Sequence, residues 1–399
     1  MRRRRFLAGV GTVAAAALAG CFGGPNRELP AAPSGTWRQH AADTANTAAT
    51  AATVPPRGNP AWDEGDVHTA APLALDDTVL APGNRVELLD GRTGETRWET
   101  DLDESVDHTP AATNDRVVVP AVGRVVALSL EDGAELWSTP LARQPRGSVT
   151  VHADAGLVTV PVRDVGLTAF DLASGENLWT EELIRASPAA VVEETDSSLL
   201  CLTGYRPDDD TGVLRGLNPD GTRQWSVTFD SPDTAPVVIE DGLLVSDDGT
   251  LTIHNPTDGS RKRTVGTFGD QVNERLAVAD GITYVVSDYN DLIAVNLADG
   301  TEMWRADVSV MVDAGPSVGA ETVVVGARKL PEASLGGILA LDRSDGSSRW
   351  GHEIEGFDIA VSAPPVVADG AVYYSSNESI GIVALGDLPP LETETDGSQ

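Results

Sequence analysis

AFDLASGENLW, from Ala169 to Trp179, is one copy of a phrase that recurs along this chain. In each copy an apolar stretch leads to a glycine, and a tryptophan follows four residues later. The glycines are Gly94, Gly133, Gly175, Gly221, Gly259, Gly300 and Gly346. The fifth copy breaks the pattern, because Arg263 takes the tryptophan position. Successive glycines are 39, 42, 46, 38, 41 and 46 residues apart, and a period near this length is typical of a β-propeller or a similar repeat array.

The sequence between the glycines predicts short antiparallel strands. In the second copy, valine-rich runs at 116–119 and 125–130 are separated by a short connection, and a further run from Glu135 carries Trp137. Short apolar runs bounded by Asp, Asn and Gly are typical of hairpins. We expect the glycine at a turn that requires positive φ, which other residues adopt only with strain.

The chain contains eight predicted first strands but only seven copies of the glycine phrase. These strands begin at Pro72, Pro110, Thr150, Pro188, Pro236, Arg275, Pro316 and Pro364. The eighth unit runs into an acidic tail without a fourth strand, and we expect the N-terminal segment 35–40 to supply it. We therefore predict an all-β fold, an eight-bladed β-propeller of four-stranded antiparallel blades, over residues 35–386. When the N-terminal segment supplies the missing strand of the last blade, the first and last parts of the chain pair and that blade has no strand position left open.

These marks resemble the PQQ-like, or quinoprotein-type, β-propeller repeat, whose signature is roughly A-x-D-x-x-T-G-x-x-x-W. The best matches are 169–179 and 340–350, and the stretch 37–47 resembles the opening of many such proteins. The resemblance implies that each repeat tryptophan packs between neighbouring blades, near the glycine turn. These blade-docking residues are Trp98, Trp137, Trp179, Trp225, Trp304 and Trp350. The resemblance predicts the fold rather than a function, because this superfold hosts enzymes, scaffolds and sensors.

The N-terminus predicts export and lipid anchoring. Arg3 and Arg4, followed by Phe6 and Leu7, resemble a twin-arginine (Tat) export signal. A short apolar run then leads to Cys21, in a stretch that resembles a lipobox, where the cysteine is lipidated. The alternative is an uncleaved anchor, although about 13 apolar residues are few for crossing a bilayer.

This interpretation divides the chain into four parts. We predict a signal peptide over 1–20, a lipidated cysteine with a flexible tether over 21–34, the propeller over 35–386, and an acidic disordered tail over 387–399. The mature protein would then lie on the extracytoplasmic face of the cell membrane, held by its lipid.

The charge balance is extreme. The chain has 28 basic and 61 acidic residues, a net charge of −33, and its only lysines are Lys262 and Lys329. Acids spread through every repeat, with so few lysines, resemble proteins of salt-loving archaea, where dissolved salt screens the self-repulsion. The alternative is an acidic surface for a cationic partner. Nucleic acid is excluded as a partner, because it requires a basic surface.

Catalytic motifs are missing from the sequence. It has no HExxH, no GxSxG and no glycine-rich phosphate loop. Many quinoprotein dehydrogenases, which share the repeat, carry an adjacent cysteine pair against their cofactor, whereas Cys201 stands alone in an apolar strand and is expected to be buried and inert. We therefore predict a protein that is not an enzyme and has no cofactor, with PQQ and calcium as the alternative.

Six side chains lie just before predicted first strands, where the central channel of a propeller opens. They are His68, Asp107, His108, Arg185, Asp233 and Asp313. They are candidates for a channel mouth that holds a cation, and the alternative is that they are solvated loop residues. Two long connections, 205–212 and 329–336, are predicted on one face of the disc. Such loops are common sites of recognition, but their length could equally be tolerated variation.

The functional prediction is an exported, membrane-anchored propeller that acts as a non-catalytic protein-binding or assembly platform on the outer face of the cell membrane. The chain resembles, in anchor and repeat, the outer-membrane assembly scaffold lipoproteins. The partner is predicted to be a protein, in addition to the membrane itself. The alternatives are a PQQ-dependent quinoprotein oxidoreductase and a ligand-sensing or solute-binding lipoprotein.

Overall fold

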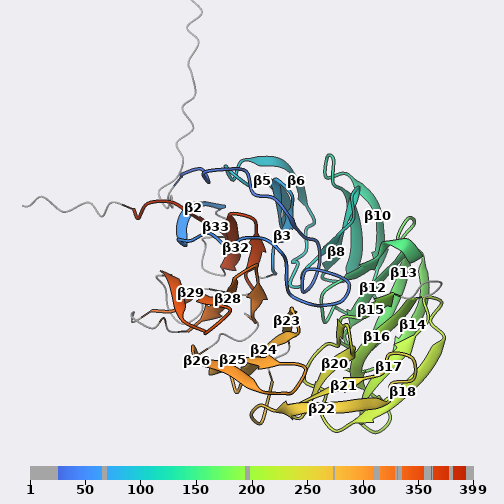
Figure 1. The fold of residues 1–399 in the computed structure, drawn as a ribbon. Helices are drawn as coiled ribbons and strands as arrows, with labels where there is room; N and C mark the ends of the chain where they lie inside the picture. Colours follow the sequence, from blue (N-terminus) through green and yellow to red (C-terminus); the bar gives the residue numbers. More distant parts are fainter. Residues whose placement is uncertain are drawn as a thin grey trace, which may run out of the picture.

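The computed structural model describes residues 26–64, 70–193, 198–272, 275–309, 315–328, 330, 335–354, 361, 363–376 and 381–391. Within these residues, eight antiparallel sheets are arranged around a central axis (Figure 1). The predicted eight-bladed β-propeller is therefore confirmed. The described part contains one short 3₁₀ helix, η1 (Ala153–Ala155), and no α-helix.

Blade 1 contains β1 (Thr36–Trp37), β3 (Leu73–Leu75), β4 (Thr78–Ala81), β5 (Arg85–Asp90) and β6 (Thr96–Asp101). Blade 2 contains β7 (Ala111–Ala112), β8 (Arg116–Ala121), β9 (Arg124–Ser129) and β10 (Glu135–Pro140). Blade 3 contains β11 (Thr150–His152), β12 (Leu157–Val162), β13 (Gly166–Asp171) and β14 (Asn177–Glu182). Blade 4 contains β15 (Ala190–Glu193), β16 (Ser198–Tyr205), β17 (Gly212–Leu217) and β18 (Arg223–Phe229).

Blade 5 contains β19 (Val237–Ile239), β20 (Gly242–Asp247), β21 (Thr250–His254) and β22 (Arg261–Thr267). Blade 6 contains β23 (Ala277–Ala279), β24 (Ile282–Ser287), β25 (Asp291–Asn296) and β26 (Glu302–Asp307). Blade 7 contains β27 (Ser317–Val318), β28 (Thr322–Ala327), β29 (Gly337–Asp342) and β30 (Ser348–Glu353). Blade 8 contains β31 (Val366–Ala368), β32 (Ala371–Ser376), β33 (Gly381–Gly386) and β2 (Asn59–Glu64).

The burial of the strands explains their composition. The middle strands of a blade are covered on both faces by neighbouring blades, so β8 and β12 are almost continuously apolar and buried. The outermost strands face solvent on one side, and β10 and β14 are accordingly mixed in polarity. Hydrophobic clusters lie between successive blades, as between blades 1 and 2, and the largest one joins the N-terminal segment to blades 1, 6, 7 and 8.

The ring is closed by an N-terminal strand, but not by the segment expected. β2 pairs with β33 from Asn59↔Gly386 to Glu64↔Ile382 and completes blade 8. Segment 35–40, which we predicted in this place, instead contributes β1, where Trp37 pairs with Ala74 of blade 1. The correct closing strand could have been found from the sequence, because Gly58 and Trp62 repeat the four-residue glycine–tryptophan spacing. In the structure the Trp350 ring packs against Gly58 and the Trp62 ring against Gly94, so this stretch is an eighth copy of the phrase.

Candidate functional site

The N-terminal residues 34–53, here called the axial segment, run along the inner ends of the blades. The inner strand of each blade turns one hydrogen-bonding edge toward the axis, and an unpaired edge buried there would be unfavourable. Backbone N–H groups of blades 2 to 8 donate to the axial segment. The pairs are Ala112 to Arg38 O (2.7 Å), Val151 to Gln39 Oε1 (3.1 Å), Val191 to Thr44 O (2.7 Å), Val238 to Ala45 O (2.8 Å), Val278 to Thr47 O (2.8 Å), Val318 to Ala48 O (2.9 Å) and Gly370 to Thr53 O (2.9 Å). Blade 1 is contacted through β1, so the axial segment touches every blade.

Small residues allow the axial segment to coil this tightly. Ala41, Ala42, Asn46 and Ala48 have positive φ, between 50° and 74°, which few side chains adopt without strain. Asp43 stabilises the coil, because its carboxylate accepts hydrogen bonds from the backbone N–H (3.0 Å) and hydroxyl (2.6 Å) of Thr47. The run of Ala and Thr that the sequence shows here therefore fits a narrow axial path.

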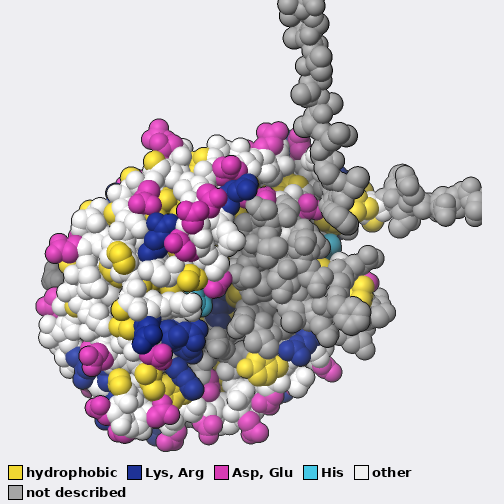
Figure 2. All heavy atoms as spheres, turned by 180° about the vertical axis from the view of Figure 1, so that it is seen from behind, with side chains coloured by type: hydrophobic (Ala, Val, Ile, Leu, Met, Phe, Trp, Pro, Cys, Tyr) yellow, Lys and Arg dark blue, Asp and Glu magenta, His cyan; other side chains and the backbone are white. Residues whose placement is uncertain are grey.

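A cavity lies on the axis beside the axial segment. This cavity of about 590 Å³, here called the central cup, has Trp37, His40 and Ala41 among its lining residues, together with the residues that lead into the inner strands. Of the six residues predicted at the channel mouth, the four described ones all line this cup: Asp107, His108, Arg185 and Asp233. His68 and Asp313 lie outside the described residues. Figure 2 shows Lys and Arg side chains gathered beside a histidine near the middle of one face, on a molecule otherwise rich in acidic side chains.

Three lining residues were missed by the sequence analysis. His40 had been assigned to a closing strand, Arg275 to a strand start, and Arg146 to no role, yet all three line the cup. Arg275 could have been singled out from the sequence, because it replaces the proline found at most of the other predicted strand starts.

Arg275 is the most deeply placed charge of the cup. Arg275 is only 8% exposed, and its guanidinium lies 5.7 Å from the centre of the Trp37 ring. Its Nη2 donates to Pro316 O and Ser317 Oγ, both at 2.6 Å, whereas its buried Nε has no partner within the described residues. Burial lowers the pKa of Arg275 to about 9, so it remains a cation at neutral pH. No carboxylate of the described chain forms an ion pair with it.

The two cup histidines are neutral. Burial, reinforced by the nearby Arg275 and His108, lowers the pKa of His40 to about 3. Burial also lowers the pKa of His108, although Asp107 and a hydrogen bond with Pro145 oppose the shift. Both imidazoles can therefore act as hydrogen-bond donors or acceptors without adding charge at neutral pH.

Asp233 is hydrogen-bonded to residues of blade 5, into which it leads. Its Oδ2 accepts hydrogen bonds from Ser246 Oγ and from the Gly249 N–H, both at 2.8 Å, and burial raises its pKa. In the described part of the chain, no group of three or more His, Cys, Asp or Glu side chains is arranged to hold a metal ion. Arg146, Arg185 and Arg275 share the wall of the cup with Asp107 and Asp233.

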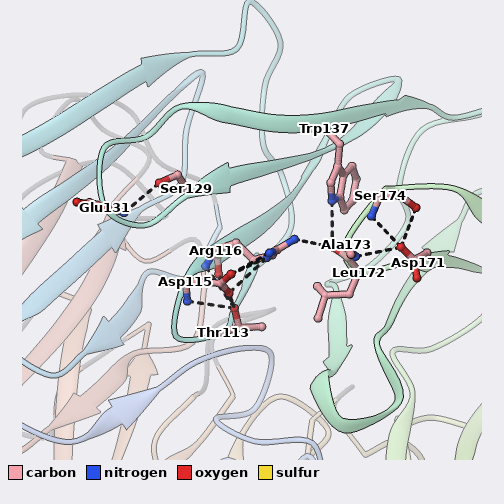
Figure 3. A network of polar contacts seen from close by, with 10 residues as sticks. All are labelled: Thr113, Asp115, Arg116, Ser129, Glu131, Trp137, Asp171, Leu172, Ala173 and Ser174. Carbon is pink, nitrogen blue, oxygen red and sulfur yellow. Dashed lines mark hydrogen bonds and ion pairs between the residues drawn. The ribbon is translucent and has the colours of Figure 1, made fainter.

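The repeat tryptophans lie at the joints between blades. Figure 3 shows the joint between blades 2 and 3, where Trp137 Nε1 donates to Leu172 O at 3.0 Å. Arg116 donates to the same carbonyl at 3.0 Å, while Asp171 accepts from the N–H groups of Ala173 and Ser174. The Trp137 ring covers Gly175, where an added Cβ would lie 2.5 Å from Cε3.

The same joint recurs around the ring. The indole N–H donates to a carbonyl of the next blade or of the segment leading into its outer strand: Trp98 to Leu130, Trp179 to Pro219, Trp225 to Pro256, Trp304 to Arg343, Trp350 to Pro55 and Trp62 to Gly91. The seven turn glycines named from the sequence have positive φ, from 72° to 85°, as expected, whereas Gly58 of the eighth copy does not. The joint between blades 5 and 6 differs, since Gly300 there faces the Val265 carbonyl and Arg263 pairs with Asp241.

The two long connections differ in how they are held. In blade 4, residues 206–211 form a self-contained turn, with an Arg206–Asp209 ion pair at 3.0 Å and a backbone bond from Arg206 N–H to Thr211 O. Tyr205, at the start of this turn, lines the cup. In blade 7, Leu330 is buried in the hydrophobic core, while 329 and 331–334 lie outside the described residues.

The sequence that forms this fold and its blade joints matches a known protein family. The sequence pattern of the family described as outer membrane protein assembly factor BamB matches residues 45–203 and 210–393. The chain belongs to the BamB family. A BamB from Burkholderia pseudomallei is 25% identical over 341 residues, which cover 78% of this chain and 84% of that protein. The crystal structure of BamB from Moraxella catarrhalis superposes with a TM-score of 0.63 at 16% identity, covering 82% of this chain and 99% of that one.

Enzymes share the same architecture as this BamB-family chain. A quinohemoprotein alcohol dehydrogenase from Pseudomonas putida superposes with a TM-score of 0.66 at 13% identity, covering 90% of this chain and 81% of that one. At this identity the likeness shows the fold alone.

The predicted export and anchoring residues lie outside the described part of the chain. This holds for Arg3, Arg4, Phe6, Leu7 and Cys21. Among the residues that are described, none belongs to a helix long and apolar enough to cross a membrane.

Proposed function

We propose that this chain is a non-catalytic protein-binding or assembly platform, held by a lipid on the outer face of the cell membrane. The observation that carries the proposal is the family match over both halves of the propeller, together with relatives that are named assembly factors. The repeat does not by itself require a ligand, because its tryptophans and glycines are used in blade joints.

Surfaces suited to a protein partner are present on the rigid ring. The connection 206–211 rises beside the cup, with Asp208, Asp209 and Asp210 exposed. On the rim, Leu136 of blade 2 and Leu178 of blade 3 are 47% and 48% exposed at the same position of neighbouring outer strands. Exposed apolar groups near a polar rim are common at interaction sites.

The test is partner capture from native membranes. The full chain, tagged at its C-terminus, is crosslinked in its own cells and purified. A variant in which residues 206–211 are replaced by a two-residue turn, like Val122–Gly123 of blade 2, should recover several-fold less of the crosslinked partner.

The control replaces Glu95 and Glu131 by serine, since both lie in exposed turns on the opposite face. This variant should recover the partner as the wild type does. Equal recovery by all three proteins would contradict a role for this connection, and the absence of any specific crosslinked protein would contradict the platform.

Membrane anchoring has its own test. Replacing Cys21 by serine removes the predicted lipid attachment, and the protein should then move from the membrane to the soluble extracellular fraction. If Cys21→Ser stays in the membrane fraction, the lipid anchor is wrong.

A PQQ-dependent oxidoreductase is the alternative proposal, supported by the fold shared with a quinohemoprotein dehydrogenase. Titration of the chain with PQQ and calcium, followed by absorbance and dye reduction with alcohols or sugars, tests it. Saturable binding with turnover would replace the platform by the enzyme.

A further inference from the structure

The cup concentrates cations that have no carboxylate partner in the described structure. Elsewhere in this acidic chain arginines are usually paired, as Arg97 is with Asp77 and Asp90 and Arg305 with Asp291 and Glu302. Arg146, Arg185 and Arg275 form no ion pair within the described residues. In a chain of net charge −33, these three arginines outnumber the two aspartates that line the same cavity, Asp107 and Asp233.

Arg275 shows that this charge is built into the fold. A buried cation is costly unless it is paired or well hydrogen-bonded. Two of its interactions, with Pro316 O and Ser317 Oγ, hold the guanidinium in place from blade 7, and Trp37 of the axial segment contacts it from another side. Its buried Nε has no partner among the described residues, and Arg275 is one of the residues that line the cup.

The entrance adds two further guanidinium groups. Arg185 lies over the Tyr205 ring, with its Cζ 5.5 Å from the ring centre, and has a positive φ of 52°. Arg146 is exposed on the adjoining connection of blade 3 and lines the same cavity. Guanidinium groups match the oxygens of carboxylates and phosphates in geometry as well as charge.

We propose that the central cup binds a small organic anion through its carboxylate or phosphate oxygens, with Arg275 as the buried anchor and Arg146 and Arg185 at the entrance. His40 and His108 supply uncharged hydrogen-bonding groups around the same volume. The cavity, about 590 Å³, has the size of a small-molecule site, for which roughly 300–1,000 Å³ is usual. Trp37, His40 and Ala41 of the axial segment form part of the cavity wall.

The test is calorimetric titration of the purified full propeller with citrate and, separately, with inorganic phosphate. EDTA is present, and the KCl concentration is held constant. Saturable one-to-one binding is expected for at least one probe, and the tighter of the two distinguishes a carboxylate site from a phosphate site. Arg146→Gln and Arg185→Gln should each weaken binding about tenfold or more, since a hydrogen bond to a charged group contributes about 1.5–3 kcal/mol.

A matched control is available in the same connection as Arg146. Arg143 is exposed and does not line the cup, so Arg143→Gln removes the same charge without touching the site and should leave the affinity unchanged. Arg275→Gln should abolish binding. Because that variant is buried and can fail to fold, the exposed Arg146 and Arg185 variants decide the question.

Three results would overturn the proposal. The first is that neither citrate nor phosphate binds, even if an acidic peptide does. The second is that Arg143→Gln weakens binding as much as Arg185→Gln, which would mean unspecific attraction to positive charge. The third is that calcium, added without EDTA, binds the cup and the anions do not. Partner capture is measured separately, so failure here leaves the platform proposal standing.

Discussion

The rim and the axis of this propeller are held together in different ways. At the rim, one device is repeated, in which a tryptophan of one blade covers a glycine turn of the next and donates its indole N–H to a carbonyl there. At the axis, one unique segment contacts all eight blades through seven different residues and β1. The rim is periodic and therefore easy to recognise in a sequence, whereas the axis is aperiodic and carries the cup.

The repeated blade joints determine the fold, whereas the residues along the axis distinguish this protein from others with the same fold. A repeated joint can be built by any chain with the glycine–tryptophan phrase, and solved structures of a BamB and of an alcohol dehydrogenase share the architecture. The cup depends on residues outside the phrase, such as His40 and Arg275. We therefore look for function at the axis and on the connections around it.

The largest effect is expected from removing the axial segment. A chain that begins at Gly58 keeps β2 but removes the partners of six inner-strand N–H groups and of the Gly370 N–H in the turn after β31. Each lost buried partner costs about 1–3 kcal/mol, so this chain should unfold at a far lower denaturant concentration or fail to fold. A chain that begins at Asn26 is the control, and equal stability of the two by denaturant titration would show that the axis contributes little.

A rim tryptophan should have the next largest effect. Trp137→Ala leaves a cavity at the joint between blades 2 and 3 and removes the bond to Leu172 O, so it should destabilise the fold by about 3–5 kcal/mol. Its neighbour Leu136 is 47% exposed, and Leu136→Ala should cost below about 1 kcal/mol. If the two variants unfold at the same denaturant concentration, the joint is not what holds the blades together.

The turn glycines allow a finer test. Gly175 and Gly156 both have positive φ, 72° and 62°, but an added Cβ meets the Trp137 ring only at Gly175 and open space at Gly156. Gly156→Ala should therefore cost about 1–2 kcal/mol from backbone strain alone, and Gly175→Ala clearly more. Thermal melts of the two variants measure the difference, and a larger loss for Gly156→Ala would refute the tight contact.

The last effect is a pH dependence, which is absent at neutral pH and appears only on acidification. Burial lowers the pKa of His352 to about 4 from its ordinary 6.5, and its Nε2 lies 3.2 Å from Tyr374 OH. The unfolded chain therefore takes up a proton at higher pH than the folded one, so stability from this group is complete above pH 6.5 and is lost as pH falls toward 4. His352→Gln should flatten the wild-type stability profile in this window. A slope identical to that of the wild type would mean that His352 is solvated.

The sequence analysis succeeded where the structure is periodic. Eight first strands and the positive φ of the turn glycines followed from spacing alone, because each blade must bury its faces against the next in the same way. The prediction was wrong where the N-terminal and C-terminal parts of the chain pair to complete blade 8. The closing strand was assigned to 35–40, although Gly58 and Trp62 carried the repeat spacing.

The axis was less predictable for a physical reason. Four channel-mouth residues were located because their position in the repeat is fixed by topology. Arg146 and Arg275 were not located, because they come from positions that lie together only after the ring has closed. The coil of the axial segment depends on positive φ at Ala41, Ala42 and Ala48, and nothing in alanine as a residue type predicts this conformation.

Hydrogen exchange at the inner strands tests the central claim most directly. If the axial segment seals the channel end, the amides of Ala112, Val191, Val238, Val278 and Val318 should exchange as slowly as the hairpin amides of the middle strands, and only by global unfolding. If the chain that begins at Gly58 still folds, these same amides should exchange faster than those of its middle strands. Fast exchange of the inner-strand amides in the intact chain would contradict the account.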